Sequence, residues 1–362
     1  MKKKKPKADA ERAAENSAFR KVGECLYRNE SSGIYYALVK RSGKQFRRSL
    51  KTKDRRLAER KLGDFRAKVG LLSTTARASY FTFEDIAKRW LESLKPTLKP
   101  SSYRRRETSV GQLRPYLGTL NLRQVDARAC EAWAAKRGTA VAASTYNNER
   151  DVIIAILAYA QREGLLIDNP GNVLARRRMP KHELVIPTRE QYAKLLATLR
   201  ASDARYEEAA NLVELLATSG MRLAEATALR WRHVDFKAKR FTVTGGERGT
   251  KNHEARVVPL FPKMEAFLRG LWQERRPAPD APVISIASAK NAIAHACSDA
   301  GLPDFTHHSL RHYFVSNAIE VGVDFKTIAA WVGHKDGGLL VAKTYGHLRD
   351  THSNEMAKRM GV

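Results

Sequence analysis

A break in the hydrophobic pattern near the middle of the chain constrains its fold most. Residues 168–172 contain Pro170 and Gly171 among polar residues, and residues 176–181 are mostly basic. Neither stretch is expected to continue a helix or form a buried strand, so the two stretches are predicted to form a linker. Because 362 residues also exceed the ~100–200 that one hydrophobic core usually serves, the sequence predicts two or three domains.

The charge of the chain points to its partner. It has 66 Lys and Arg against 38 Asp and Glu, a net charge of +28, and half of this excess lies in residues 1–75. A membrane surface would favour one basic amphipathic anchor, whereas these basic residues are spread over several segments. A solvated surface is the alternative reading, but the excess is larger than solubility requires. We therefore expect double-stranded DNA as the partner and no membrane contact.

Composition predicts an ordinary globular protein of the cytoplasm. Hydrophobic residues make up 43% of the chain, and no apolar run approaches the ~18 residues of a membrane span. The lysines after Met1 are followed by polar residues, without the apolar segment of a signal peptide. Cys25, Cys130 and Cys297 are far apart in the sequence, which predicts three reduced thiols and neither a disulfide framework nor a zinc ribbon.

The N-terminal segment is predicted to combine a β-hairpin with a helix. Residues 34–39 and 45–50 flank a turn at residues 41–44, and a helical pattern begins near Asp54. The basic residues at this turn are candidate DNA contacts: Lys40, Arg41 and Lys44.

A small all-α domain is predicted from about residue 81 to residue 169. Thr82, Ser101 and Asp126 are plausible helix caps, and Gly164 is a plausible stop. The run 144–163 carries one apolar stripe, formed by Val152, Ile153, Ile156, Leu157 and Ala160. Near the start of the second helix, a basic cluster could contact phosphates, although solvation is nearly as good an explanation: Arg104, Arg105 and Arg106.

From about residue 184 the pattern is mainly helical, but residues 240–260 predict an inserted β-hairpin. Lys251 lies near its turn, where a long side chain could reach a cleft. The glycines of residues 245–251 resemble a phosphate loop, but Gly-Lys-Ser/Thr is absent and no strand-to-helix turn surrounds them. No nucleotide cofactor is expected.

Several polar residues of this region could carry chemistry. Arg222 follows a helix stop at Gly220, and Glu225 is one turn further on, where it could orient the guanidinium. Taken alone, this pair is more often a surface ion pair than a phosphate site.

His308, Arg311 and His312 would share one helical face. Their His-x-x-x-His spacing also occurs in zinc proteases, but Ser309 stands where that motif needs glutamate and Arg311 would repel a dication. We therefore expect no metal site. His334 follows a glycine that ends an apolar helix, and Tyr345 lies eleven positions later.

Six residues in order form a recognisable series: Arg222, Lys251, His308, Arg311, His334 and Tyr345. With the Tyr-Gly-His-Leu tail, this series resembles the active-site signature of the tyrosine recombinases, the phage-integrase family. The resemblance covers nearly the whole chain and implies a multidomain fold, mainly α with β. It implies a basic tail (1–16), a small β-rich arm-type DNA-binding domain (17–75), an all-α core-site DNA-binding domain (76–176), a linker (177–183) and a mixed α+β catalytic domain with a β-hairpin insertion (184–362).

The series also makes chemical sense. Two guanidinium groups, of Arg222 and Arg311, would stabilise the charge that builds on a phosphodiester under attack. A tyrosine of ordinary pKa ~10 needs cationic surroundings or a base to react near neutrality, which suits Tyr345 as nucleophile. The resemblance implies His308 as the base, with His312 in support, and Lys251 as the general acid. It further implies that His334 donates a hydrogen bond to the phosphate, and we expect Glu225 to orient the site.

The expected reaction is site-specific recombination through a 3′-phosphotyrosine and a Holliday junction, without ATP or metal. The family acts as homotetramers on core and arm attachment sites of a mobile element, and DNA-bending accessory proteins are further partners of such assemblies. One departure is that Tyr345 lies two positions further from His334 than the family usually places it, with Gly337-Gly338 marking the predicted insertion. A type IB topoisomerase-like enzyme and a non-catalytic DNA-binding regulator are the rival interpretations.

Overall fold

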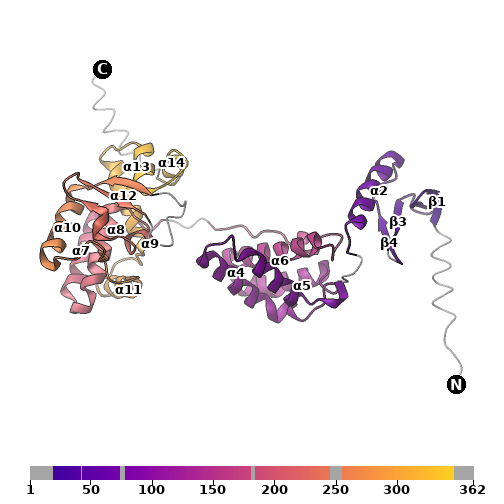
Figure 1. Ribbon diagram of the computed structural model, residues 1–362, viewed down its shortest axis with the longest axis horizontal. Coiled ribbons are helices and arrows are strands. Elements are labelled where there is room, and N and C mark those ends of the chain that lie inside the picture. The colour runs from indigo at the N-terminus through magenta and orange to yellow at the C-terminus, as the bar shows by residue number, and fades with distance from the viewer. Residues whose placement is uncertain (1–18, 42, 74–77, 181–183, 245–254, 346–362) are drawn as a thin grey trace, which may run out of the picture. The chain divides into compact units, whose positions relative to one another are not determined.

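The structure is a computed structural model that describes residues 19–41, 43–73, 78–180, 184–244 and 255–345. It divides into two units, residues 1–180 and 181–362, and each combines helices with one small antiparallel sheet (Figure 1). The expected mainly α fold with small β elements is confirmed at this level, and the finer domain boundaries remain predictions.

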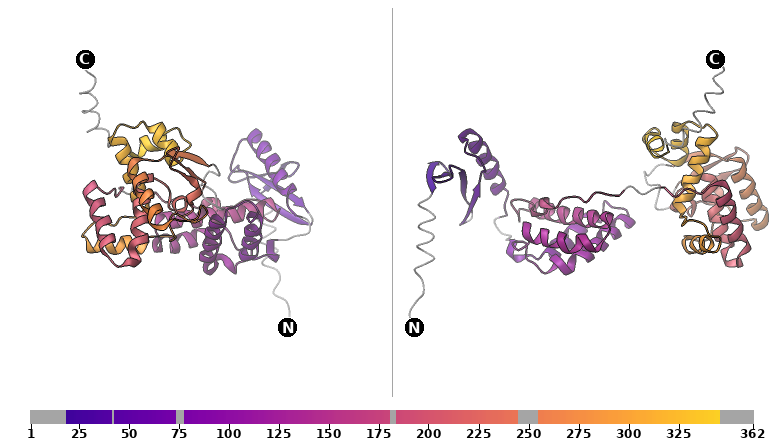
Figure 2. Two further views of the ribbon diagram at one scale, coloured as in Figure 1. Left: turned by 60° about the vertical axis from the view of Figure 1, so that its left-hand side comes forward. Right: turned by 180° about the vertical axis from the view of Figure 1, so that it is seen from behind.

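A four-stranded sheet opens the first unit. Its strands, in spatial order, are β1 (Phe19–Gly23), β2 (Leu26–Asn29), β3 (Tyr35–Arg41) and β4 (Lys44–Ser49). The predicted hairpin is β3 and β4, paired from Tyr36↔Ser49 to Arg41↔Lys44. Helix α2 (Arg55–Gly70) begins after Asp54, whose carboxylate accepts from the Leu57 amide, as the sequence predicted. Its apolar side packs on β3, which closes a small core of its own (Figure 2).

The rest of the first unit is helical. Its main elements are α3 (Phe83–Leu94), α4 (Pro100–Leu113), the π-helical turn η2 (Arg114–Gly118), α5 (Ala127–Ala140) and α6 (Ala143–Arg162). The five residues of the predicted stripe on α6 are all buried. Thr82 and Asp126 cap α3 and α5 as expected. The expectation for Ser101 was wrong: α4 begins at Pro100, which needs no partner for a first-turn amide.

The chain after the bundle is held to α6 as far as Arg177. The Asn147 side chain donates to the Arg177 carbonyl and accepts from the Arg177 amide, each at 2.9 Å. Arg150 donates to the Leu174 carbonyl at 2.7 Å. Residues 174–177 are therefore fastened along the start of α6.

The second unit contains most of the predicted chemical residues. Its helices are α7 (Arg189–Ala201), α8 (Glu207–Ser219), α9 (Leu223–Ala226), α10 (Pro262–Arg275), α11 (Lys290–Asp299), α12 (His307–Glu320), α13 (Phe325–Val332) and α14 (Leu339–Tyr345). The sheet contains β5 (Val234–Asp235), β6 (Arg240–Val243) and β7 (Arg256–Pro259), and β6 and β7 are the expected hairpin. Helix α8 is buried on most sides and packs against α7, α10 and α12.

Candidate active site

Arg222 lies in the short turn between the end of α8 and the start of α9. Helix α8 ends at Gly220, whose φ of +63° and contact with the Phe314 ring leave no room for a side chain. The chain then turns, and Arg222 precedes the first residue of α9. Its Nη1 lies 3.0 Å from Glu225 Oε1, and its amide donates to Glu225 Oε2 at 3.0 Å. The predicted pairing of Arg222 with Glu225 is present, and Glu225 is only 3% exposed.

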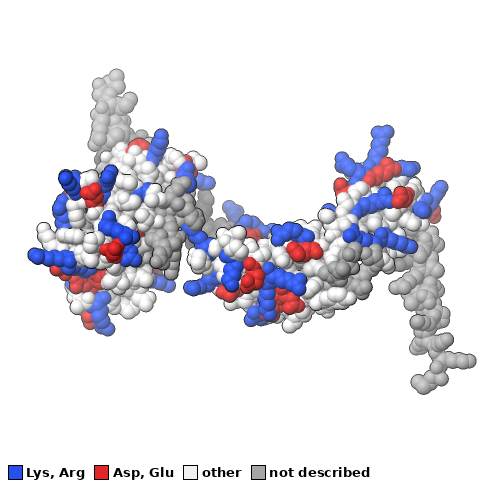
Figure 3. Space-filling model, viewed as in Figure 1, with Lys and Arg blue, Asp and Glu red and all other residues white. Residues whose placement is uncertain are grey.

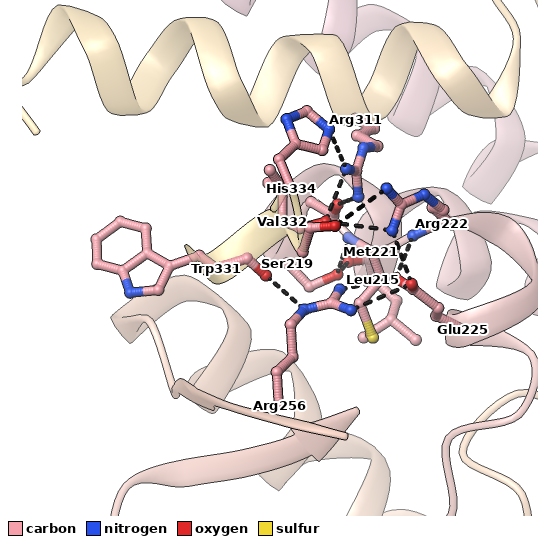
Figure 4. Close-up of polar contacts among 12 residues, drawn as sticks. Leu215, Ser219, Met221, Arg222, Glu225, Arg256, Arg311, Trp331, Val332 and His334 are labelled. Atoms are coloured by element: carbon pink, nitrogen blue, oxygen red, sulfur yellow. Dashed lines mark hydrogen bonds and ion pairs between the residues drawn. The ribbon is translucent and has the colours of Figure 1, made fainter. Parts of the chain in front are cut away.

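Arg311 projects from α12 into the same site. It is 4% exposed, and it donates to the Gly220 carbonyl at 2.6 Å and the Val332 carbonyl at 2.8 Å. Burial and the charge of Arg222 lower the pKa of Arg311 to about 9, which leaves it mainly protonated at neutral pH. Two cationic groups therefore converge near one buried carboxylate (Figure 4).

The last turn of α13 closes the site. Gly333 ends the helix at a φ of +71°, as predicted, and His334 follows it. Arg222 donates to the Val332 and Gly333 carbonyls at 3.4 Å each. His334 Nε2 lies 3.1 Å from Arg311 Nη2, and its buried Nδ1 has no partner among the described residues. Burial and then Arg311 lower the pKa of His334 to about 4, so the ring is neutral at physiological pH.

The predicted nucleophile, Tyr345, is hydrogen-bonded to a histidine of α12. Tyr345 ends α14, is 4% exposed, and its hydroxyl is hydrogen-bonded to His312 Nδ1. Burial raises the pKa of the phenol, although Arg311 opposes that effect. Burial, His308 and Arg311 lower the pKa of His312 to about 4, so its ring can accept from the phenol.

The structure therefore brings His312 to the tyrosine, whereas the sequence favoured His308. The ring of His308 packs edge-on against His312, with centroids 4.4 Å apart, and burial with the charges of Arg311 and Arg222 lowers its pKa. The three α12 side chains share the predicted helical face. Gly337 and Gly338, at φ of +65° and +100°, form the turn before α14, where the insertion was predicted.

Arg256 is a site residue that the sequence analysis missed. It begins β7, and its guanidinium pairs with both oxygens of Glu225, at 2.7 and 3.1 Å. Its Nε donates to the Trp331 carbonyl at 2.8 Å. A signal was available, because side chains alternate between the two faces of a strand. Arg256 is two positions from buried Val258 and therefore lies on the buried face of β7, whereas Val257 is exposed on the other face. Lys251 lies outside the described residues.

The predicted DNA contacts differ in exposure. Lys40 is exposed at the end of β3, and Arg104 and Arg105 are exposed on α4, where Arg106 is half-buried. Arg41 instead donates to the Val69 and Gly70 carbonyls at the end of α2, so its guanidinium already stabilises the fold. Lys44 is the first residue of β4. Basic side chains project over the N-terminal sheet and α2 on the face seen in Figure 3.

Within the described ranges, no three His, Cys, Asp or Glu side chains are grouped so that they could hold a metal ion. None of the helices in the described part of the chain is long and apolar enough to cross a membrane.

Comparison with known proteins identifies the family. Residues 187–352 match the profile of the phage integrase family, and residues 82–137 match the profile of its N-terminal SAM-like domain. Together these matches cover more than half of the chain. The chain belongs to the phage integrase family of tyrosine recombinases.

Two relatives in this family match this chain over more than half of their own length. Tyrosine recombinase XerD of Neisseria meningitidis is 26% identical over 203 residues, which cover 52% of this chain and 67% of XerD. Tyrosine recombinase XerC of Mycobacterium tuberculosis is 25% identical over 236 residues, or 59% of this chain and 76% of XerC.

Solved structures share the fold. The Tn1549 transposon integrase in complex with transposon right end DNA aligns with a TM-score of 0.61 at 16% identity, covering 78% of this chain and 100% of that one. A lambda integrase tetramer bound to a Holliday junction aligns with a TM-score of 0.60 at 17% identity, covering 88% and 98%.

Proposed function

We propose that this tyrosine recombinase cleaves and rejoins double-stranded DNA at specific sites, with Tyr345 as the nucleophile. One observation carries the proposal: the half-buried guanidinium of Arg222 and the buried guanidinium of Arg311 converge in the same unit in which α12 presents His312 to the Tyr345 hydroxyl. Family membership alone would leave open whether this chain has a competent site.

The phosphate would bind where the arginines now contact carbonyls. Three arginines and one carboxylate leave the site cationic, and the contacts of Arg222 with Val332 and Gly333 are long, at 3.4 Å. A phosphodiester offers stronger acceptors to these guanidinium groups. His334 would add a hydrogen bond, because the tautomer that accepts from Arg311 carries its proton on the unpaired Nδ1.

The reaction exchanges one phosphoester bond for another. Tyr345 Oη attacks phosphorus and passes its proton to the imidazole pair of His308 and His312. The P–O5′ bond breaks, and the departing 5′ oxygen takes a proton from Lys251. The products are a 3′-phosphotyrosine and a free 5′-hydroxyl. A 5′-hydroxyl of another strand reverses these steps, so ligation needs no ATP.

The buried state of Tyr345 sets a condition on this reaction. At 4% exposure the Tyr345 side chain must be uncovered before its hydroxyl, which is hydrogen-bonded to His312, can meet phosphorus within bonding distance. The glycine turn at Gly337 and Gly338 lies directly before α14 and could supply that movement. Activity would then depend on assembly on DNA, which agrees with the lengthened spacing between His334 and Tyr345.

The biological setting follows by analogy with the relatives. A lambda integrase has been seen as a tetramer on a Holliday junction, and the Tn1549 integrase on transposon end DNA. For this chain we propose a homotetramer that recombines core and arm attachment sites of a mobile element, with DNA-bending proteins as accessory partners. Such a substrate places the reaction at the bacterial nucleoid.

A nicked suicide substrate containing the attachment core tests the proposal. The protein should become covalently linked to the DNA 3′ end, and Tyr345→Phe should abolish this product while retaining DNA binding. Binding without any covalent product in the unaltered chain would support a non-catalytic regulator instead. Undiminished trapping by Tyr345→Phe would remove the nucleophile assignment.

The same assay tests the expected independence from metal. Cleavage should persist in EDTA, because the proposed charge stabilisation comes from guanidinium groups. Strict dependence on Mg²⁺ would contradict this mechanism. Relaxation of supercoiled DNA without strand exchange would favour the topoisomerase-like alternative.

A further inference from the structure

Arg256 joins three separate parts of the catalytic unit. It comes from β7, its two terminal nitrogens reach Glu225 at the start of α9, and its Nε reaches Trp331 at the end of α13 (Figure 4). The side chain is only 13% exposed. All three nitrogens of the guanidinium are therefore engaged with protein acceptors, which suits a support role better than direct phosphate binding.

Glu225 accepts hydrogen bonds from both Arg256 and Arg222. Oε1 accepts from Nη1 of each arginine, at 3.1 and 3.0 Å, and Oε2 accepts from Arg256 Nη2 and the Arg222 amide, at 2.7 and 3.0 Å. Burial alone would raise the pKa of Glu225, but Arg256 and, less strongly, Arg222 lower it to about 2. Arg256 is thus the main partner that keeps this buried carboxylate ionised and in place.

The end of α13 supplies a second connection. The carbonyls of three consecutive residues face the arginines: Trp331 accepts from Arg256, Val332 from both Arg222 and Arg311, and Gly333 from Arg222. These are carbonyls that a helix end leaves without helical partners, and they lie at the negative end of its dipole. By holding Trp331, Arg256 fixes the turn on which the two phosphate-binding arginines rest.

Gly333 shows how close this packing is. A Cβ on Gly333 would lie 2.8 Å from Arg256 Nη1 and 3.1 Å from its Cζ. The guanidinium cannot simply swing aside, because its other contacts are to buried Glu225 and to the Trp331 carbonyl. The glycine and Arg256 therefore form one fitted contact beside His334.

We propose that Arg256 is a positioning residue for strand cleavage, which orients Arg222 through Glu225 and through the last turn of α13. The inference rests on the proposed function, because it assigns Arg256 a part in stabilising the scissile phosphate indirectly.

The test compares two scissile linkages in single-turnover cleavage of a suicide substrate by the full chain. One substrate has the normal phosphodiester, and the other has an uncharged methylphosphonate, which needs less help from a correctly placed guanidinium. Arg256→Met should slow cleavage of the phosphodiester about 10- to 100-fold, the usual cost of a misplaced catalytic group, with DNA affinity unchanged. On the methylphosphonate its defect should shrink at least about tenfold.

Two further variants separate positioning from folding. The double variant Glu225→Gln, Arg256→Met should cleave DNA no more slowly than the slower of the two single variants. This is expected because Arg256 acts on Arg222 through Glu225, so the two substitutions disturb the same contact. Arg240→Met, on the neighbouring strand β6 at a side chain that is 59% exposed, is the matched control and should cleave both linkages at the unaltered rate. If Arg256→Met does not fold, Arg256→Lys should show the same dependence on linkage with a smaller defect.

The outcomes are distinguishable. Failure of the unaltered chain to form a covalent product would reject the proposed function itself. Normal phosphodiester cleavage by Arg256→Met would reject the inference alone. Equal defects on both linkages would also reject it, since they would mark a general structural loss.

Discussion

At the scale of single residues, Gly333 should be sensitive to an added methyl group for two reasons. Its φ is +71°, and its Cβ position is occupied by Arg256. Gly337 offers a matched control, because its φ of +65° is similar but nothing lies within 4 Å. Gly337→Ala should cost about 1 kcal/mol of stability from backbone strain, and Gly333→Ala about 2–4 kcal/mol.

Urea unfolding of the two variants measures this difference, and the cleavage assay gives a second reading. Gly333→Ala should also slow cleavage, because Arg256 must move, whereas Gly337→Ala should affect cleavage less. Equal losses of stability in the two variants would show that the contact with Arg256 contributes nothing.

Sequence spacing predicted contacts within one helix better than contacts between elements. Arg222 with Glu225, and the shared face of His308, Arg311 and His312, follow from spacings within one helix. The contact of His312 with Tyr345 joins positions 33 residues apart, and that of Arg256 with Glu225 joins positions 31 apart. Such contacts depend on how α9, α12, α14 and β7 pack together, which local periodicity does not determine.

At the scale of elements, the sequence predicted the helix ends that position the site residues. Gly220 and Gly333 signalled the ends of α8 and α13 because left-handed backbone favours glycine. Strands β1 and β2 were missed because they are short, and Gly23 and the positive φ of Cys25 interrupt their pattern. No local pattern predicted that side chains of α6 would hold residues 174–177.

That fastening can be tested through Asn147. Its amide makes two hydrogen bonds to the backbone of Arg177 and is 4% exposed, so Asn147→Ala should cost about 1–3 kcal/mol and release the segment. Limited trypsin digestion should then cut faster among residues 176–178. Asn148→Ala, the adjacent residue of the same type, is the control. Unchanged digestion of Asn147→Ala would show that the two bonds do not restrain the linker.

At the scale of the whole molecule, the neutral histidines should make the protein sensitive to acid. His312 and His334 have pKa values of about 4, below the ordinary value of ~6.5 expected when unfolded. Between these values the unfolded chain binds protons that the folded chain does not. The contribution of these two histidines to stability should therefore be fully present above about pH 6.5 and should fall as the pH drops toward 4, by up to about 3 kcal/mol for each histidine.

Urea midpoints at pH 7.5 and pH 5.0 test this expectation. His334→Asn should reduce the loss between the two pH values, and His295→Asn, at an exposed position of α11, should leave it unchanged. A loss as large in His334→Asn as in the unaltered chain would assign the acid sensitivity to other groups.

The charge distribution predicts that residues 1–75 bind the arm sites and the rest of the chain binds the core site. Residues 1–75 carry half of the net charge, and Lys40 and α2 display basic side chains there. A chain that begins at residue 76 should still protect the core site in footprinting but lose protection at distal arm sites. Because each neutralised phosphate releases about one counterion, the truncated chain should also bind with a shallower dependence on salt. The unaltered chain at the same salt concentrations is the reference. Retained distal protection, or an unchanged salt slope, would place the arm contacts elsewhere in the chain.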